Sequence, residues 1–436
     1  MTTLLYLAWL GIGLALLLVL LLGRTRNANL IFFAGILFVS GLATPLSLSD
    51  VVEQTFWLPV QSRRSELFLA FGLMGTAALL LQSRRANRVD LSLASTFYFL
   101  SLLYAALLRG YHEGAIVLFE STVFCVFTVI PLALWSSNYV QSPNNLAIIQ
   151  RVILLVNILT IGFVAVQFVQ DSSMLTLGNA NRFRGLLSNP QHAGVQFALF
   201  SASALWIMLH DKARYFTVAL AVLAVNGVLL LWSGSRTSMA MFLLAGGVIA
   251  YPRLGRQAIY LPLFALIGFG VYSIVTTKLG VDIQTDRLAA GGNTRSEAWR
   301  MLIRQGVNNP LTGVGVVDSE KSENGWLYGF ATYGIGMLAI QLIWTAAAIR
   351  EILVLVRRRN RFAPEIRPTA YYCIGILLAY FGGAVFEGYL ISRVSTPMCI
   401  AFLAFTLTLL IRKTADVGSV QPSKKTTTYP HASYGT

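Results

Sequence analysis

Residues 325–348 read GWLYGFATYGIGMLAIQLIWTAAA and contain no charged side chain. A helix needs about 20 apolar residues to cross the hydrocarbon core of a bilayer, so this stretch is long enough to span it. The chain as a whole has the same character, because 56% of its 436 residues are hydrophobic and only 12% are charged. Soluble domains carry about 25% charged residues, so the composition indicates an integral membrane protein.

Apolar runs of similar length recur along the chain. They lie at 3–23, 29–48, 66–82, 91–108, 115–136, 148–169, 190–209, 214–232, 237–251, 257–276, 325–348, 369–390 and 395–411. Each is expected to be helical, because lipid cannot satisfy the backbone polar groups of an open strand. The run at 237–251 is short and two others are marginal. The sequence therefore predicts an all-α, polytopic transmembrane bundle of 12 or 13 spans.

The basic residues predict which face of the bundle is cytoplasmic. With thirteen spans, one face carries Arg24 and Arg26, Arg84, Arg85 and Arg88, Lys212 and Arg214, Arg253 and Arg256, the run 357–361, and Arg412 and Lys413. Lysine and arginine accumulate in cytoplasmic loops, close to anionic lipid. Residues 1–413 then form one membrane domain, and 414–436 form a disordered cytoplasmic tail. Positive charge scattered over short loops argues against binding of nucleic acid.

A polar segment, 278–323, precedes the 325–348 run, and the alternation of spans places it on the opposite, outer face. Unstructured loops of this length are uncommon and usually functional. Eight arginines lie on this face: Arg182, Arg184, Arg236, Arg287, Arg295, Arg300, Arg304 and Arg393. Guanidinium groups suit phosphate oxygens, so we expect an anion site here. The structural alternative is that spans late in the chain insert regardless of a few outer charges.

Two short motifs on the outer face fit an anion site. The first is Asn189-Pro190, which follows Arg184 and is typical of a helix start. Helix N-termini attract phosphate, although a plain re-entry turn explains the motif equally well. The second is the stretch 233–238, SGSRTS, in which Arg236 is either a second phosphate clamp or an arginine that snorkels at a helix start.

The long polar segment itself predicts a helix. Thr294 and Glu297 have capping-box spacing, so the helix is expected to start at Arg295 and to end at Asn309-Pro310. Its apolar side, expected to dock on the membrane domain, comprises Trp299, Leu302, Ile303 and Val307. Arg300 and Arg304 share another face. Gly313-Val314-Gly315 then allows a tight turn. A purely structural lid is the alternative.

Taken in chain order, these motifs resemble the superfamily of O-antigen ligases and O-antigen polymerases. They are Arg184-Gly185 with Asn189-Pro190, Ser235-Arg236, Arg295-x3-Trp299, and Pro310-Leu311-x-Gly313-x-Gly315. The resemblance covers roughly residues 147–412. It implies a glycosyltransferase of the bacterial inner membrane with its active site facing the periplasm. Such an enzyme transfers glycan from undecaprenyl diphosphate to a saccharide acceptor, without nucleotide sugar, cofactor or metal.

The chain departs from the family pattern at one position. Family members commonly carry a His-Asn pair at the end of the long loop, where the histidine is thought to activate the acceptor hydroxyl. This chain has Glu323-Asn324 followed by Gly325-Trp326-Leu327. A carboxylate can also accept a hydroxyl proton, so Glu323 is the expected base and His192 the alternative. The absent histidine favours a polymerase over a ligase.

We therefore predict a glycan polymerase that acts on lipid-linked repeat units. The expected catalytic residues are Glu323, Arg184 and Arg295, with the donor diphosphate held by Arg184 and assisted by Arg236 and Arg295. The further substrate-binding residues are Arg182, Asn189, His192, Arg300, Asn324, Trp299 and Trp326. Membrane lipids and a chain-length regulator protein are the other expected partners.

Two alternatives to the polymerase stay open. One is ligation of glycan onto lipid A core. The other, from a different class, is a flippase or exporter of lipid-linked oligosaccharide. Proton-coupled or ion-coupled transport usually needs charged groups within the spans. Here the spans are nearly uncharged, and the exceptions are Glu66, Glu120, His192 and Glu387. That scarcity weighs against a transporter.

Overall fold

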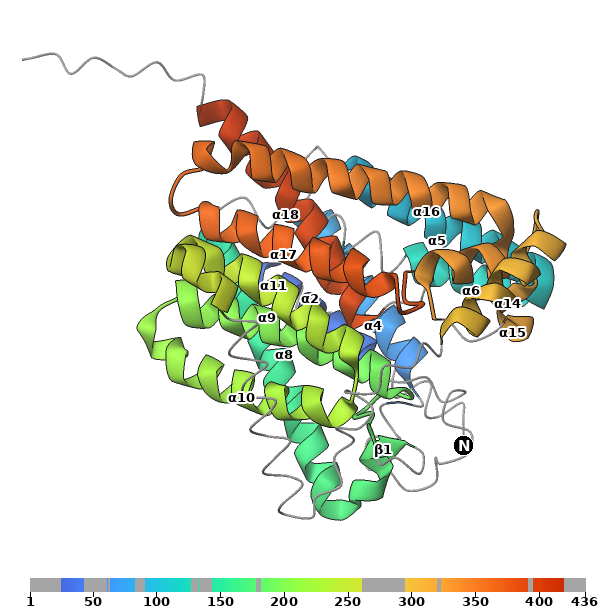
Figure 1. Ribbon diagram of the computed structural model, residues 1–436, viewed down its shortest axis with the longest axis horizontal. Coiled ribbons are helices and arrows are strands. Elements are labelled where there is room, and N and C mark those ends of the chain that lie inside the picture. The colour runs from blue at the N-terminus through green and yellow to red at the C-terminus, as the bar shows by residue number, and fades with distance from the viewer. Residues whose placement is uncertain are drawn as a thin grey trace, which may run out of the picture.

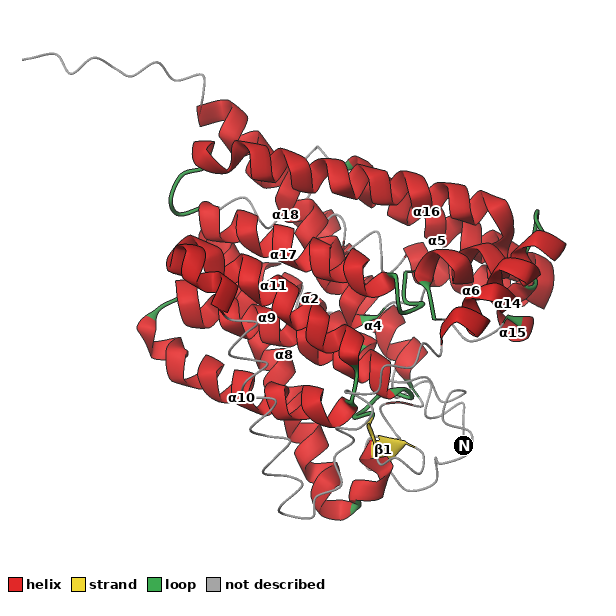
Figure 2. Cartoon of the chain, in the orientation of Figure 1, coloured by secondary structure: helices red, strands yellow, loops and turns green. Residues whose placement is uncertain are grey.

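The computed structural model describes residues 25–42, 61, 63–82, 91–126, 132, 143–177, 182–260, 295–319, 323–390 and 395–418. Within these ranges the protein is an all-α helical bundle (Figures 1 and 2). Six of its described helices are long and apolar enough to cross a membrane. The predicted fold class is confirmed, and the chain is a multi-pass membrane protein. The run at 3–23, most of 257–276, Arg287, Arg393 and residues 419–436 lie outside the described residues.

The described helices follow the predicted apolar runs closely. In chain order they are α2 (Thr25–Ser40), α4 (Arg64–Gln82), α5 (Leu93–Glu113), α6 (Ala115–Phe124), α8 (Pro143–Gln170), α9 (Pro190–His210), α10 (Phe216–Ser233), α11 (Arg236–Leu254), α14 (Arg295–Asn308), α15 (Gly315–Asp318), α16 (Gly325–Arg358), α17 (Arg367–Ala384) and α18 (Thr396–Gly418). The last helix continues into the segment predicted to be a tail.

The connection between α8 and α9 holds a small element that the sequence did not predict. A 3₁₀ turn, η4 (Ser172–Leu175), leads into β1 (Thr176–Leu177), which pairs antiparallel with β2 (Arg182–Phe183). Phe183 is fully buried and stacks on Trp232 of α10, with 5.1 Å between the ring centroids. The strand pair therefore fixes the predicted arginine motif against the end of α10.

The helices pack in a layered bundle. In Figure 1, α11 lies between α9 and α17, and α10 covers the other side of α9, while α16 runs beside α5 and α17. An aromatic cluster fills the space between α16, α17 and α18, where Trp344 contacts Phe381 and Phe405 with ring centroids 5.2 and 6.2 Å apart. At Gly375 the backbone of α17 approaches that of α11 closely, and small residues commonly allow this in membrane bundles.

Hydrogen bonds between helix ends define the two ends of the bundle. At one end, Arg151 of α8 pairs with Asp211 after α9, and the Trp206 indole donates to the Pro368 carbonyl. At the other end, Arg182 donates to the Ser233 carbonyl, and the Ser238 hydroxyl donates to the carbonyl of Gln191. We call this second end the site end, because the start of α9, the turn between α10 and α11, and the start of α14 all lie there.

The run at 325–348 does not form one straight span. Gly334 has a non-helical conformation, with φ 78° and ψ −172°, and it divides α16 into residues 325–333 and 335–358. The first part, which we call the fold-back segment (325–333), lies against the second part. The side-chain amide of Gln341 donates to the Gly325 carbonyl at 3.1 Å, and the Trp326 indole donates to the Thr345 hydroxyl at 3.0 Å. A straight helix would hold those partners far apart.

The Pro310–Gly315 segment explains why the chain can turn so sharply. Ile335 donates its backbone amide to the Pro310 carbonyl at 2.7 Å, and Val314 donates to the Ala331 carbonyl at 2.9 Å. These bonds satisfy backbone groups near the break in the helix. A Cβ atom on Gly313 would collide with the backbone of Thr332. Gly313, expected to allow a tight turn, is thus also needed for close backbone contact.

The second part of α16 extends further than the predicted run. It continues beyond 348 to Arg358 and buries Glu351, which is 3% exposed. At the site end, α16 and α5 continue past the ends of α9, α11 and α17 (Figure 1). The helices α14 and α15 pack on this projecting part, α14 against α16 and α15 against both α16 and α5.

Candidate functional site

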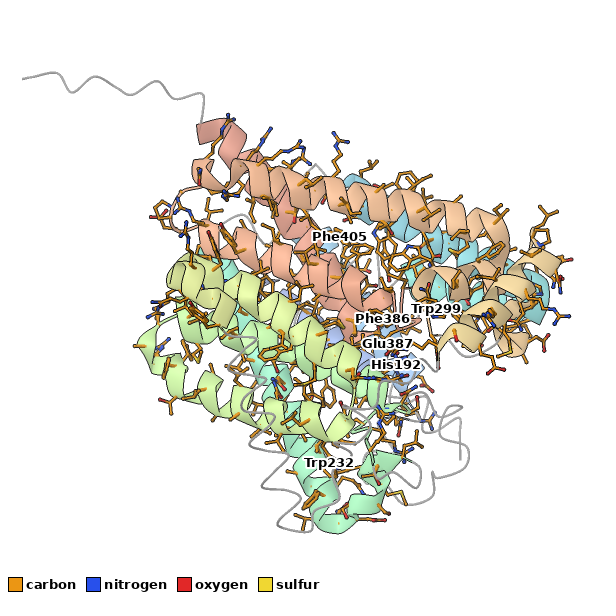
Figure 3. All side chains as sticks on the ribbon, in the orientation of Figure 1. His192, Trp232, Trp299, Phe386, Glu387 and Phe405 are labelled. Carbon is orange, nitrogen blue, oxygen red and sulfur yellow. The ribbon has the colours of Figure 1, made fainter. Side chains whose placement is uncertain are left out.

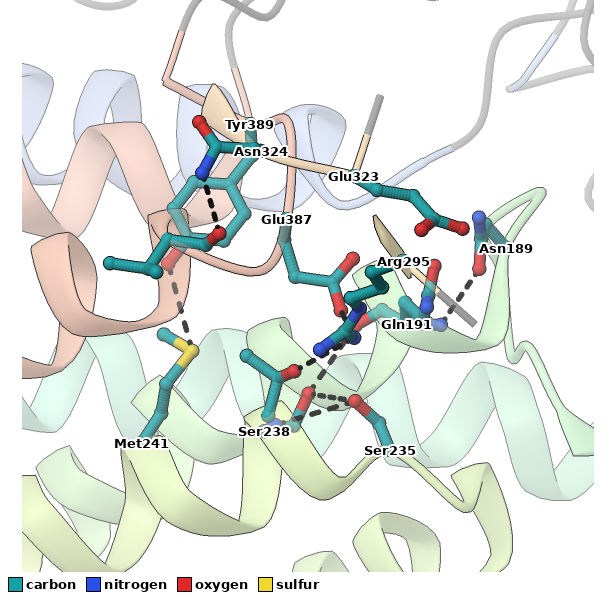
Figure 4. Close-up of polar contacts among 12 residues, drawn as sticks. Asn189, Gln191, Ser235, Ser238, Met241, Arg295, Glu323, Asn324, Glu387 and Tyr389 are labelled. Carbon is teal, nitrogen blue, oxygen red and sulfur yellow. Dashed lines mark hydrogen bonds and ion pairs between the residues drawn. The ribbon is translucent and has the colours of Figure 1, made fainter. Parts of the chain in front are cut away.

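The site is built around an ion pair between α14 and the turn that follows α17. The guanidinium of Arg295 donates to the Glu387 carboxylate and to the Thr237 hydroxyl, each at 3.2 Å (Figure 4). It also lies over the Phe386 ring, 5.2 Å from its centroid. The Glu387 side chain is 1% exposed, so the pair is removed from solvent on the carboxylate side. Buried charges of this kind are retained only where they are paired.

Three charged groups act on the Glu387 carboxyl at this place. Burial raises the pKa of Glu387, which lies in the turn beyond the end of α17, to about 7. The charges of Arg295 and Arg182 and a hydrogen bond with Thr237 lower this pKa, whereas the Glu323 carboxylate raises it further. We call Arg182, Arg295, Glu323 and Glu387 the charged cluster. Three of them are predicted site residues, and Glu387 was noted in the sequence as one of the few charged groups within the predicted spans.

Glu323 lies immediately before the fold-back segment. Its backbone carbonyl accepts a hydrogen bond from the Trp299 indole at 3.3 Å, which ties it to α14. One carboxylate oxygen, Oε2, is buried and has no hydrogen-bond partner among the described residues. Figure 4 shows the carboxylate extending toward the side on which Asn189 lies. An unpartnered buried oxygen is costly in a folded protein, and it is expected where a ligand group completes the site.

Asn324 joins the two carboxylate-bearing segments. Its side-chain oxygen accepts from the backbone amides of Trp326 and Leu327, at 3.0 Å each, and so caps the fold-back segment. Its side-chain nitrogen donates to the Val385 carbonyl at 2.8 Å, in the turn that carries Glu387. One amide therefore fixes Glu323 and Glu387 relative to each other.

The helix predicted within the long polar segment is confirmed, with bounds Arg295–Asn308, although Thr294 lies outside the described residues. The prediction of its docking face was wrong in part. Ala298, Leu302 and Gly306 are buried, whereas Ile303 and Val307 are 46% and 63% exposed. The helix is rotated because Gly306 packs directly against the Phe330 ring, which leaves no room for a side chain, and this rotation directs Arg295 toward Glu387.

The same rotation places Arg300 away from the cluster. Arg300 and Arg304 are both exposed, and Arg300 follows Arg295 by five residues, or about 140° around a helix. Arg300, a predicted substrate-binding residue, is therefore not brought together with Arg295 and Glu387. Trp326 also points elsewhere, because its indole donates to Thr345 within α16.

The two arginines around β2 differ in what they contact. Arg182 is 8% exposed, and its Nε donates at 2.9 Å to the Ser233 carbonyl, at the end of α10. Arg184 is 4% exposed and donates to the Met174 carbonyl at 3.1 Å, and burial lowers the pKa of its guanidinium. Of the two, Arg182 is the one whose charge lowers the pKa of Glu387. Arg236, the first residue of α11, is exposed.

The predicted helix start at Asn189-Pro190 is present. The Asn189 side chain caps α9 by accepting from the Gln191 amide at 2.8 Å. His192 is half-buried in the first turn (Figure 3). Gly194 packs against Ser238 of α11 so closely that a Cβ atom would overlap its side chain. The starts of α9 and α11 are therefore held next to each other.

Four helix starts converge at the charged cluster. They belong to α9, α11, α14 and the fold-back segment, and Asn189, Ser235 and Asn324 cap three of them. Each helix N-terminus carries partial positive charge. Among the described residues, no group of three histidine, cysteine, aspartate or glutamate side chains is arranged to hold a metal ion. The arrangement favours binding of an anion by arginines and backbone amides.

Comparison of the sequence with models of protein families found no matching family, and comparison with curated proteins found no matching relative.

Proposed function

We propose that the protein is a membrane glycosyltransferase that polymerises undecaprenyl-diphosphate-linked oligosaccharide repeat units at the periplasmic face of the bacterial inner membrane. The observation that carries this proposal is the convergence of four helix starts and two arginines on a pair of carboxylates, at one end of an apolar bundle. A site with this chemistry suits a substrate that is anionic where it binds, lipid-soluble at one end, and a source of hydroxyl groups at the other.

The donor diphosphate would bind at the converging helix starts. Arg295 and Arg182 lie within the charged cluster, Arg184 directly follows β2, and Arg236 is the first residue of α11. Guanidinium groups and helix N-termini both stabilise phosphate oxygens. As the sugar leaves, negative charge grows on the diphosphate, and a fixed donor aimed at that charge lowers the barrier by about 3 kcal/mol.

Glu323 would act as the general base. The acceptor hydroxyl oxygen attacks the anomeric carbon of the donor sugar, and the bond from that carbon to the phosphate oxygen breaks. The electron pair leaves with the diphosphate, and the hydroxyl proton passes to Glu323. The buried, unpartnered Oε2 of Glu323 supports this role, because a proton acceptor needs an unoccupied lone pair. Direct displacement inverts the anomeric centre.

Glycan synthesis by purified protein tests the proposal. The protein in detergent is mixed with an undecaprenyl-diphosphate-linked oligosaccharide, and the products are separated by gel. A ladder of longer glycans, formed without a membrane gradient, is the expected result. Glu323→Gln should abolish the ladder, whereas Glu120→Gln, on an exposed position of α6, should leave it unchanged. The unfolding temperature of each variant reports whether it has folded.

The same assay separates the alternatives. Transfer of one glycan to an added lipid A core acceptor, without a ladder, would identify a ligase. Movement of the lipid-linked oligosaccharide across liposomes, with no new glycosidic bond, would contradict the proposal and support an exporter.

A further inference from the structure

Glu387 occupies the place where the proposed diphosphate would bind. Its carboxylate accepts from Arg295, the arginine best placed for a phosphate, and the Glu323 carboxylate lies close enough to repel it. The Glu387 side chain is 1% exposed and Arg295 is 25% exposed, so the guanidinium is the partner that a ligand can reach. The Glu387 carboxylate therefore occupies the position beside Arg295 that an anionic ligand would take.

We infer that Glu387 is an internal counterion, which releases Arg295 to the incoming diphosphate and takes up a proton as it does so. The inference rests on the proposed function, because it concerns the same anion site. It assigns Glu387 a positioning role: the residue holds Arg295 in place until the donor arrives, and it does not touch the reacting atoms.

The charges around Glu387 make release without a proton unfavourable. The titratable groups that face it are Arg295 from α14, Glu323 before the fold-back segment, Arg182 from β2, and Tyr389 in its own turn; His192 lies in the first turn of α9 at the same end. Once Arg295 turns to a dianion, an ionised Glu387 would be buried beside two negative groups. Of the described positive groups that act on Glu387, Arg182 alone would then still face it. A buried carboxyl in such surroundings is stable in its neutral form.

The electrostatics of the Arg295–Glu387 ion pair point the same way. With Arg295 still in place, burial already raises the pKa of Glu387 to about 7. Loss of that partner and arrival of a dianion both disfavour the carboxylate, so both raise the pKa further. Thr237, which contacts both members of the ion pair, can keep its hydrogen bond to a neutral carboxyl group. The anion and the proton should therefore bind together.

Calorimetry on the full-length protein tests this coupling. The probe is a P1,P2-dialkyl diphosphate, which keeps two negative charges across the working range and does not titrate there. Its binding heat is measured in two buffers of different ionisation enthalpy, and the difference gives the number of protons taken up. We expect close to one proton per anion near pH 8, falling toward none near pH 6. The affinity should weaken about tenfold between those limits.

Two variants separate the coupling from a merely structural role. In Glu387→Gln the side chain cannot titrate, so proton uptake should disappear and the affinity should become independent of pH, while binding persists. In Glu323→Gln, proton uptake should remain, but the pH range over which it appears should shift to lower pH. The reason is that the variant lacks the negative charge that raises the pKa of Glu387. Unaltered uptake in Glu387→Gln would overturn the inference.

The outcomes also distinguish the inference from the proposed function. Binding of the probe to the wild type without proton uptake, together with a normal glycan ladder, would overturn only the counterion role. Failure of the probe to bind at any pH, together with no ladder, would overturn the anion site and the proposed function with it.

Discussion

The side-chain amide of Gln341 donates to the backbone carbonyl of Gly325 at 3.1 Å, although sixteen residues separate them within one apolar run. This contact holds the fold-back segment against the rest of α16, so the two form a helical hairpin that turns at Gly334. Asn324 therefore lies beside α16 rather than beyond its end. As a result, Glu323 faces the ends of the shorter helices. Had residues 325–348 formed one straight helix, its first residue would lie about 24 Å from Gln341, and Glu323 would lie far from Glu387.

A cysteine cross-link tests the hairpin. A Cβ atom on Gly329 would touch the Gln341 side chain, so Gly329→Cys combined with Gln341→Cys places two thiols next to each other. The native cysteines Cys125, Cys373 and Cys399 are all buried and should not interfere. After mild oxidation in membranes the protein is unfolded in SDS before labelling, because positions 329, 341 and 348 are all buried in the fold. The disulfide should then protect both new thiols from maleimide. The matched pair Gly329→Cys with Ala348→Cys should stay reactive, and equal reactivity of the two pairs would contradict the hairpin.

The turn itself depends on glycine. Gly334 has φ 78°, and a Cβ atom there would meet the carbonyl groups of Pro310 and Leu311. Gly334→Ala is therefore expected to lose about 1–3 kcal/mol of stability. The measurement is the temperature of unfolding in detergent. Gly227→Ala is the control, since nothing lies within 4 Å of that position in α10, and alanine should stabilise a helix by up to about 1 kcal/mol. Equal effects of the two changes would disprove this account of the turn.

Arginines on α14 should differ sharply in their effect on turnover. Arg295 belongs to the charged cluster, so Arg295→Gln is expected to slow glycan transfer by about 10²–10³-fold. Arg295→Lys should recover only part of that loss, because an ammonium lacks the planar fork of donors. Arg300→Gln, on the exposed side of the same helix, should leave the rate near that of the wild type. The initial rate of ladder formation distinguishes these cases, and a larger loss at Arg300 would contradict the observed rotation of α14.

Glu387 should make stability depend on pH in a defined direction. Its pKa in the folded protein is about 7, above its ordinary value of 4.5, because burial favours the neutral carboxyl. The folded state therefore holds a proton that the unfolded state has lost, and stability should fall as pH rises from about 4.5 to about 7. Glu387→Gln removes this contribution. The difference in unfolding temperature between Glu387→Gln and wild type should grow across that window and then level off. A constant difference would argue against the raised pKa.

Much of the fold follows from the sequence, because apolar runs and helix caps are local signals. The start of α9 at Asn189-Pro190 and the bounds of α14 are correct for this reason. The break at Gly334 was not predicted, since an uncharged run gives no sign that two of its parts lie side by side. It depends on contacts with Pro310 and Val314, which only the folded chain supplies.

The types of side chain at the site could be predicted from the sequence, but not which of them pair with each other. The arginines were identified from their place on one face, and Glu323 from the position at which the resembled family carries a histidine. Arg182, Arg295 and Glu323 do act on one carboxyl. That carboxyl, Glu387, lies 92 residues from Arg295 in sequence, and no spacing rule connects them. The docking face of α14 was predicted only in part, because the helical period gives relative directions around the helix but not which of them faces the bundle. The docking of Gly306 on Phe330 decides that orientation.

Single-turnover transfer by Glu323→Gln tests the central claim most directly. Purified wild type, Glu323→Gln and the control Glu120→Gln are each mixed with one equivalent of undecaprenyl-diphosphate-linked oligosaccharide and an acceptor saccharide, and the new glycosidic bond is quantified by mass spectrometry. Wild type and Glu120→Gln should both form product, while a folded Glu323→Gln protein that still binds the dialkyl diphosphate should form none. Product formation by Glu323→Gln at the wild-type rate would contradict the assignment of Glu323 as the base. Absence of product from the wild type would contradict glycan transfer itself.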